Sequence, residues 1–218
     1  MTTIPVEQLS FTFDASVVPF QYEVAGVCIA GWPQGAKAVD VVAHDLPVPA
    51  QCTWLIEAKD YWVITKPPKP TNLTGLAATV EAKVRDSLAA LPVVGVQSTD
   101  AAAKAHVNLA AAAPAIRVVL HLQPHPSSGQ HAALFPASWI SNVLLQLRIN
   151  LADIDSNSLV LDLARTATAN IPWSLTNSAK TNIHCILYLA CRSSGPRGSS
   201  TCGTEISRRG KIWAWFST

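Results

Sequence analysis

The chain has 218 residues with a net charge of +2; 49% of its residues are hydrophobic and only 14% are charged. This length suits one sizeable α/β domain, or one domain with an appendage, and the hydrophobic content excludes a disordered chain. The small net charge excludes a globally basic nucleic-acid-binding protein, so any such surface must be a local patch. The shortage of charged residues suggests that part of the surface is covered by a second subunit.

The N-terminus has no basic start followed by a long apolar run, so we expect no signal peptide. No stretch of about 18 apolar residues occurs, so we expect no membrane span. The cysteines are odd in number and irregularly spaced: Cys28, Cys52, Cys185, Cys191 and Cys202. That spacing argues against a disulfide framework or a structural zinc site and indicates a reducing cytoplasm as the location.

In chain order, the first expected elements are strands. Residues 9–13 alternate apolar and polar side chains, and residues 38–43 and 52–59 are short apolar runs typical of buried strands. Pro67, Pro68 and Pro70 then predict a stiff connector, because proline cannot continue a sheet.

Helices dominate the next part of the chain. Residues 74–91 carry apolar side chains at spacings of three and four, and residues 99–113 are rich in alanine and stop before Pro114. A third buried strand is expected at 116–122, a helix at 136–154 and a short strand at 159–163. This order predicts one α/β domain with a mixed central sheet and helices on both faces.

The composition changes after residue 165. We therefore divide the chain into an α/β domain, residues 1–165, and a C-terminal extension, residues 166–218. The end of this extension is basic and rich in serine and glycine. It is interpreted either as a flexible basic arm or as residues added for expression.

Two of the predicted strands hold charged residues among apolar ones. Asp40 lies in Ala-Val-Asp-Val-Val, and Glu57 and Lys59 lie in Leu-Ile-Glu-Ala-Lys. A buried carboxylate is costly unless it is paired or holds a cation. Alternation along a strand places Glu57 and Lys59 on one face, and Asp40 can approach them if the two strands are neighbours. Both carboxylates and the carbonyl of Ala58 would then offer oxygen ligands to Mg²⁺.

The pattern Val39-Asp40 … Glu57-Ala58-Lys59 resembles the signature of the P-D-(D/E)-x-K nuclease superfamily over about residues 9–160. In that signature an Asp on one strand is followed by (Asp/Glu)-x-Lys near the end of the next. The resemblance implies a restriction-endonuclease-like fold that cleaves DNA, in preference to RNA, with Mg²⁺ or Mn²⁺. Asp40 and Glu57 would bind the metal together with Ala58, and Lys59 would position the attacking water.

The resemblance also suggests an additional acid from the first helix, for which Glu23 is the candidate in this chain. Two features depart from the superfamily pattern: Val39 replaces the proline of the signature, and the helix at 74–91 has no Gln-x-x-x-Tyr element. Since cutting two strands often uses two active sites, a homodimer is expected.

Four basic residues are candidates for contacts with phosphate: Lys66, Lys69, Lys83 and Arg85. For Lys66 and Lys69, in the proline connector, plain solvated lysines are an equal alternative. For Lys83 and Arg85, the preferred interpretation is a solvated helix face with local ion pairs.

Three other interpretations of the motif stay open. The charged residues could form a structural ion pair at a strand end. The domain could be a catalytically silent nuclease-like fold that acts as a nucleic-acid-binding or protein-assembly module. It could also be an unrelated α/β protein with a chance motif, in which case the Asp40 and Glu57 carboxylates would lie too far apart to share a metal ion.

Overall fold

The structure is a computed structural model that describes residues 1–22, 37–46, 51–62, 74–124, 135–136 and 138–177, and the backbone of 204–206 and 212–214. The chain divides into two compact units, Met1–Ala179 and Lys180–Thr218. Within the second unit, β9 (Thr204–Ile206) pairs antiparallel with β10 (Ile212–Ala214). The first unit contains all the features discussed below.

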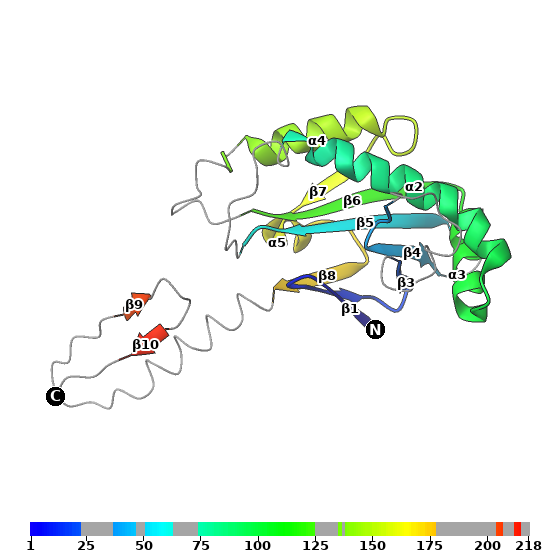
Figure 1. Cartoon of the computed structure of the whole chain (residues 1–218), viewed down its shortest axis with the longest axis horizontal. Coiled ribbons are helices and arrows are strands. Elements are labelled where there is room, and N and C mark those ends of the chain that lie inside the picture. The colour runs from blue at the N-terminus through cyan, green and yellow to red at the C-terminus, as the bar shows by residue number, and fades with distance from the viewer. Residues whose placement is uncertain are drawn as a thin grey trace. The chain divides into compact units, whose positions relative to one another are not determined.

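The centre of the first unit is a five-stranded mixed sheet (Figure 1). Its strands, in spatial order, are β3 (Val17–Gln21), β4 (Val41–Asp45), β5 (Cys52–Asp60), β6 (Ala115–Gln123) and β7 (Leu159–Leu161). β4 pairs antiparallel with both β3 and β5, whereas β6 pairs in parallel with both β5 and β7. Parallel strands need a crossover connection, which helices supply between β5 and β6. The expected α/β class with a mixed sheet is therefore confirmed.

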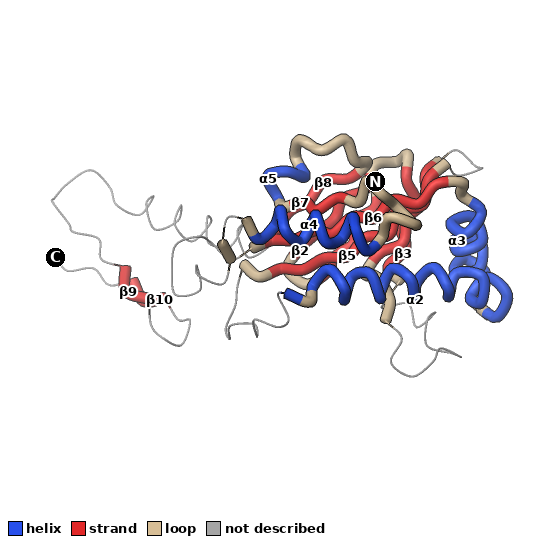
Figure 2. The backbone as a smooth tube through the Cα atoms, turned by 90° about the horizontal axis from the view of Figure 1, so that it is seen from above, coloured by secondary structure: helices blue, strands red, loops and turns tan. Residues whose placement is uncertain are grey.

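Three helices cover one face of this sheet, as the view from above shows (Figure 2). They are α2 (Leu76–Gln97), α3 (Ala101–Ala112) and α4 (Trp139–Asn150). Their apolar stripes pack on the strand residues that point to this side, among them Leu55, Val118 and Leu120. The result is the larger of the two hydrophobic clusters.

The opposite face is covered by a second sheet, not by long helices. This sheet contains β1 (Thr2–Val6), β2 (Leu9–Phe13) and β8 (Trp173–Asn177), all antiparallel. Phe11, Phe13 and Trp173 pack there against Val119 and Ile56 of the central sheet. The expectation of helices on both faces is therefore wrong. Among the residues that the structure describes, only the one-turn helix α5 (Leu163–Thr166) lies beside this second sheet.

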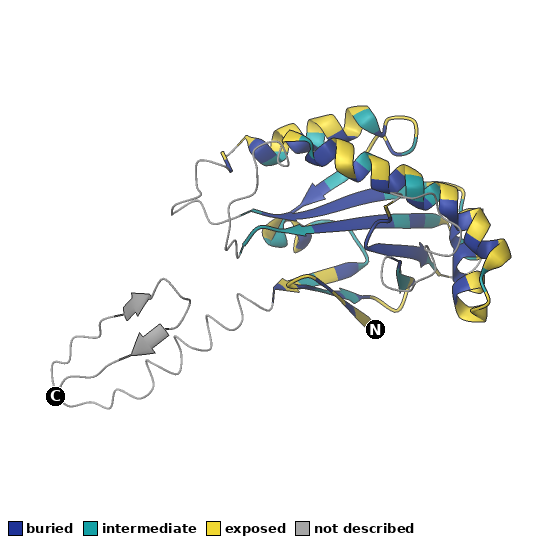
Figure 3. Ribbon diagram, viewed as in Figure 1, coloured by how far each residue is buried: buried dark blue, intermediate teal, exposed yellow. Residues whose placement is uncertain are grey.

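Burial follows this layered arrangement (Figure 3). The central strands are buried on both faces, while the helices and the second sheet keep exposed residues on their outer sides. β8 belongs to the first unit because it forms a full antiparallel ladder with β2. The first compact unit thus extends past residue 165, the boundary expected from composition, to Ala179.

Two element boundaries also differ from the sequence predictions. The second predicted strand begins at Val41 and not at residue 38, for a reason given with the site below. The first long helix does not end at Leu91 but continues through Pro92 to Gln97. Burial of Leu91 and Val94 offsets the energetic cost of the helical hydrogen bond that the proline cannot donate. No helix in the described part of the chain is long and apolar enough to cross a membrane.

Candidate active site

The pairing of β4 with β5 brings the two halves of the motif together. Val41 lies opposite Ile56 in this antiparallel ladder, so one further step in the same register places Asp40 beside Glu57. The Asp40 carboxylate accepts a hydrogen bond of 2.7 Å from the backbone N–H of Ala58. Asp40 and Ala58, 18 positions apart, therefore meet because the start of β4 lies beside the last part of the antiparallel strand β5.

Helix α2 fixes the segment that leads into β4. Ser87 Oγ accepts a hydrogen bond of 2.9 Å from the N–H of Val39, and the carboxylate of Asp86 accepts one of 2.9 Å from the N–H of Lys37. These backbone donors bond to helix side chains, which explains why the strand starts only at Val41. The contacts also set the position of Asp40 relative to α2.

Glu57 is the centre of a compact ion-pair cluster. Its side chain is 1% exposed, and its Oε1 atom lies 2.8 Å from Lys59 Nζ and 2.9 Å from Lys83 Nζ. Lys83 Nζ also donates a hydrogen bond of 3.0 Å to Oε2 of Glu57 and lies 3.9 Å from Oδ1 of Asp40. One ammonium group thus lies within reach of both buried carboxylates.

The ammonium group of Lys59 is less buried, with a side chain 24% exposed. Burial lowers the pKa of Lys59, but the charge of Glu57 and the hydrogen bond to it raise the pKa, and Asp40 and Glu7 add to this effect. The result is a pKa above the usual lysine value. Lys59 is therefore a cation at the edge of the cluster in the structure as it stands.

Glu7 approaches the same cluster from the other sheet. It lies in the two-residue turn between β1 and β2 and has a φ of 54°, a left-handed conformation that is uncommon for residues other than glycine. Its Oε2 accepts a hydrogen bond of 3.0 Å from the N–H of Asp60, and its Oε1 lies 3.9 Å from Lys59 Nζ. The hairpin tip thereby adds a third carboxylate.

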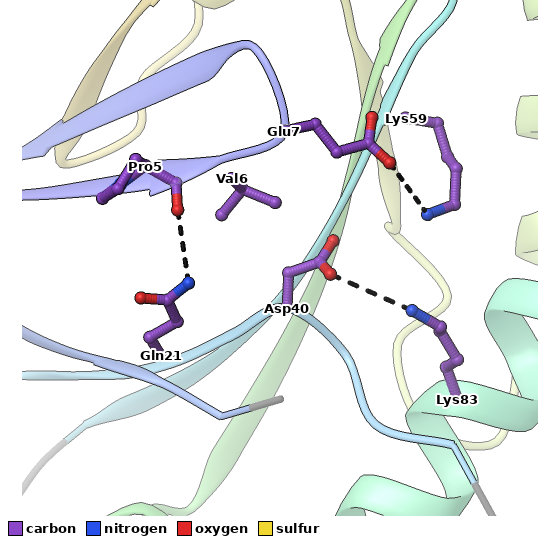
Figure 4. Close-up of a pocket in the computed structure, with 7 residues that line it drawn as sticks. All are labelled: Pro5, Val6, Glu7, Gln21, Asp40, Lys59 and Lys83. Carbon is purple, nitrogen blue, oxygen red and sulfur yellow. Dashed lines mark hydrogen bonds and ion pairs between the residues drawn. The ribbon is translucent and has the colours of Figure 1, made fainter. Parts of the chain in front are cut away.

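Four of these charged side chains, Glu7, Asp40, Lys59 and Lys83, line a pocket of about 280 Å³ (Figure 4). Its lining residues are Pro5, Val6, Glu7, Gln21, Asp40, Lys59 and Lys83. The figure shows Glu7 and Lys59 on one side of the pocket and Asp40 with Lys83 on the other. Together with the buried Glu57, these side chains make a cluster of three carboxylates and two ammonium groups with a formal charge of −1.

The donor set suits a hard divalent cation. Asp40 and Glu57 supply carboxylate oxygens, and a cationic group, the ammonium of Lys83, already lies between them. Mg²⁺ is usually bound by one or two carboxylates and completes its shell with water and substrate phosphate. No group of three or more His, Cys, Asp or Glu side chains with metal-binding geometry is found among the described residues. Asp40 and Glu57 would be the side chains that hold such an ion.

Of the remaining predicted site residues, three are not described by the structure and one lies away from the cluster. Glu23, Lys66 and Lys69 lie outside the described residues. Arg85 lies on the outer surface of α2, where its guanidinium group forms 3.0 Å contacts with Asp153 as well as with Glu81. It does not line the pocket.

For one residue of the cluster, Lys83, the preferred interpretation of the sequence is wrong, and for another, Glu7, the sequence carried no prediction. Lys83 does not lie on a solvated helix face, because it is buried and paired with Glu57. A signal for this was present: Lys83 and Ser87 follow Val80 by three and seven residues, which places two polar residues in the buried stripe of α2. Glu7 had no such signal, since only the contact between the sheets brings it to Lys59.

His121 has a structural role in the core between the sheets. Its Nε2 atom accepts a hydrogen bond of 3.0 Å from the indole of Trp173, and its Nδ1 atom lies 3.3 Å from the hydroxyl of Thr166. Burial lowers the pKa of His121 to about 3, so the ring is neutral.

Comparisons with protein-family models, with curated proteins and with solved structures find no match to this chain.

Proposed function

We propose that the chain is a metal-dependent phosphodiester hydrolase that cleaves DNA, with its centre at Asp40, Glu57 and Lys59. The observation that carries the proposal is the sharing of one cation by Asp40 and Glu57, with Lys59 beside them at a pocket. The approach of both carboxylates to Lys83 Nζ, at 3.9 and 2.9 Å, supports a common centre over a chance motif. The antiparallel pairing of β4 with β5, which brings Asp40 beside Glu57, adds support to this proposal.

The charge of the cluster favours a reaction that depends on a divalent cation. At −1, the group of three carboxylates and two lysines would repel a phosphodiester. Addition of one divalent cation would change the sign to +1 and permit phosphate to enter. When bound, Mg²⁺ or Mn²⁺ would activate water and neutralise charge on the scissile phosphate.

The residues of the chain have separate tasks in this proposal. Asp40, fixed by the N–H of Ala58, and Glu57, fixed by its lysine partners, hold carboxylate oxygens in place for the cation. Lys59 is held 2.8 Å from Glu57 and lines the pocket. From there it would orient the attacking water and stabilise negative charge that develops on the phosphoryl oxygens.

The test is a cleavage assay with supercoiled plasmid, linear duplex DNA, single-stranded DNA and RNA, each with Mg²⁺, Mn²⁺ or EDTA. We expect the wild type to cut DNA only with a divalent cation, and Asp40→Asn and Lys59→Met to lose at least about a hundredfold in rate. Lys104→Met, an exposed position on α3, removes the same charge far from the pocket and should cut normally. A wild type that cuts no substrate would refute the proposal.

A second candidate is a catalytically silent nuclease-like fold that binds nucleic acid or assembles with protein. The observation in its favour is that the chain's own lysines already pair with Glu57 and reach Asp40, so the cluster is complete without a metal. This candidate predicts no turnover by the wild type on any substrate. It also predicts that Asp40→Asn impairs stability but leaves partner or nucleic-acid binding unchanged.

A further inference from the structure

Lys83 differs from the other lysine of the cluster in its position. Its ammonium group lies 2.9 and 3.0 Å from the two oxygens of Glu57 and 3.9 Å from Asp40, whereas Lys59 contacts Glu57 and the exposed Glu7. Lys83 therefore lies between the two carboxylates proposed to bind metal. A divalent cation bound by both would need the same space.

Close to Lys83, helix α2 is held by hydrogen bonds to the chain segment that precedes β4. Ser87 and Asp86, one turn further on, bind the backbone of the segment before β4, so the helix cannot easily shift away from Asp40. The lysine side chain has four methylene groups, and it lines the pocket. Its ammonium group can thus move toward the pocket by side-chain rotation alone, with no change in the backbone.

We propose that Lys83 is a resident cation that holds the place of the divalent ion between Asp40 and Glu57 and turns into the pocket when that ion binds. In the pocket its charge would contact the phosphate of the substrate, on the side opposite Lys59. The exchange keeps the two buried carboxylates neutralised in both states, which avoids the cost of leaving them unpaired. The second half of this inference rests on the proposed nuclease function; the competition with a divalent ion does not.

The test separates metal binding from cleavage. Removing the ammonium group with Lys83→Met takes away both a competitor and a repulsive charge, so Mn²⁺ should bind at least about tenfold more tightly than to the wild type, measured by calorimetry or by the electron paramagnetic resonance signal of free Mn²⁺. The same variant should cut DNA about a hundredfold more slowly at saturating metal, because the phosphate contact is lost. A residue with only a structural role would not move these two quantities in opposite directions.

Two control variants sharpen the comparison. Lys83→Arg keeps the positive charge and should not bind Mn²⁺ more tightly than the wild type. Lys104→Met removes a lysine outside the site and should change neither quantity. If Lys83→Met does not fold, Lys83→Gln takes its place in the same comparison. In either variant, Mn²⁺ should raise the midpoint of thermal unfolding by more than it does in the wild type.

The outcomes distinguish this inference from the proposed function. Tighter Mn²⁺ binding with slower cleavage supports both. Tighter Mn²⁺ binding in a protein whose wild type cuts nothing supports the place-holding role of Lys83 and refutes the nuclease. Equal or weaker Mn²⁺ binding by the folded neutral variants, or failure of wild type and variants alike to bind Mn²⁺, would overturn the inference. Tighter binding with unchanged cleavage would overturn the phosphate contact.

Discussion

Replacing Glu57 by Gln should destabilise the protein strongly, because it leaves Lys83 buried beside a neutral amide. Glu57 is almost fully buried, and its carboxylate forms ion pairs within 3.0 Å with the ammonium groups of Lys59 and Lys83. Removing one partner of a buried pair typically costs about 3–5 kcal/mol. Asp40 remains 3.9 Å from Lys83, and Lys59 can turn toward solvent, so we expect the lower end, about 3 kcal/mol.

The cluster offers a double-mutant cycle for this prediction. Lys83→Met alone leaves Glu57 with Lys59 as its partner and should cost about 1–2 kcal/mol. In the double variant the amide no longer faces a buried charge. The free energy of unfolding of the double variant should therefore fall by about 1–2 kcal/mol less than the sum of the decreases in the two single variants.

The free energy of unfolding would be measured by urea denaturation at pH 7 in EDTA, followed by circular dichroism. Glu81→Gln is the matched control, since Glu81 lies on the same helix and pairs with the exposed Arg85. It should leave the free energy of unfolding nearly unchanged. If Glu57→Gln costs no more than this control, or if the single losses simply add, the charges do not stabilise one another as the distances indicate.

Three further predictions concern the rest of the fold. Burial lowers the pKa of His106 to about 4, helped by the nearby His44, and that of His121 to about 3. Unfolded chains protonate histidine near pH 6.5, so stability should fall as the pH drops from about 6.5 toward 4 and 3; urea unfolding of His106→Phe should show a weaker fall. Burial and the charge of Asp45 raise the pKa of Cys52 to about 12, so iodoacetamide should label it far more slowly in the native than in the unfolded protein, as read by peptide mass spectrometry. Asp155→Ala should cost about 2–3 kcal/mol in urea unfolding, since this buried carboxylate accepts backbone hydrogen bonds of 2.8 and 3.0 Å.

Much of the central sheet could be predicted from the sequence, because its strands are buried on both faces and therefore read as apolar runs. β5 was expected at 52–59 and is found at Cys52–Asp60, and β6 was expected at 116–122 and is found at Ala115–Gln123. The signal was weaker for strands that face solvent on one side. Of the second sheet, β2 was expected, but β1, which contains a proline, and β8, in the part assigned to the C-terminal extension, were not.

Because β1 and β8 were not predicted, both covering layers of the central sheet were expected to be helices. A sheet that is apolar on both faces needs a covering layer on each face. In chains where strands and helices alternate, both layers are usually made of helices. Here the helices gather on one face, and the aromatic side chains of β2 and β8 cover the other. Pairing of β2 with β8 joins residues more than 150 positions apart in sequence, a separation at which no local pattern can indicate contact.

The candidate site shows the same division between local and long-range information. Asp40, Glu57 and Lys59 stood out because charges inside apolar strands need an explanation, and the antiparallel register then brought the carboxylates together. The polar position of Lys83 in an apolar helix stripe carries the same kind of signal, and the same rule would have placed it in the site. Glu7 obeys no such rule, since its turn is exposed and its contact with Lys59 depends on how two sheets meet. A polar residue at a buried position of a predicted element is thus the more dependable sign of a site than charge alone, because only a partner inside the protein can offset its burial.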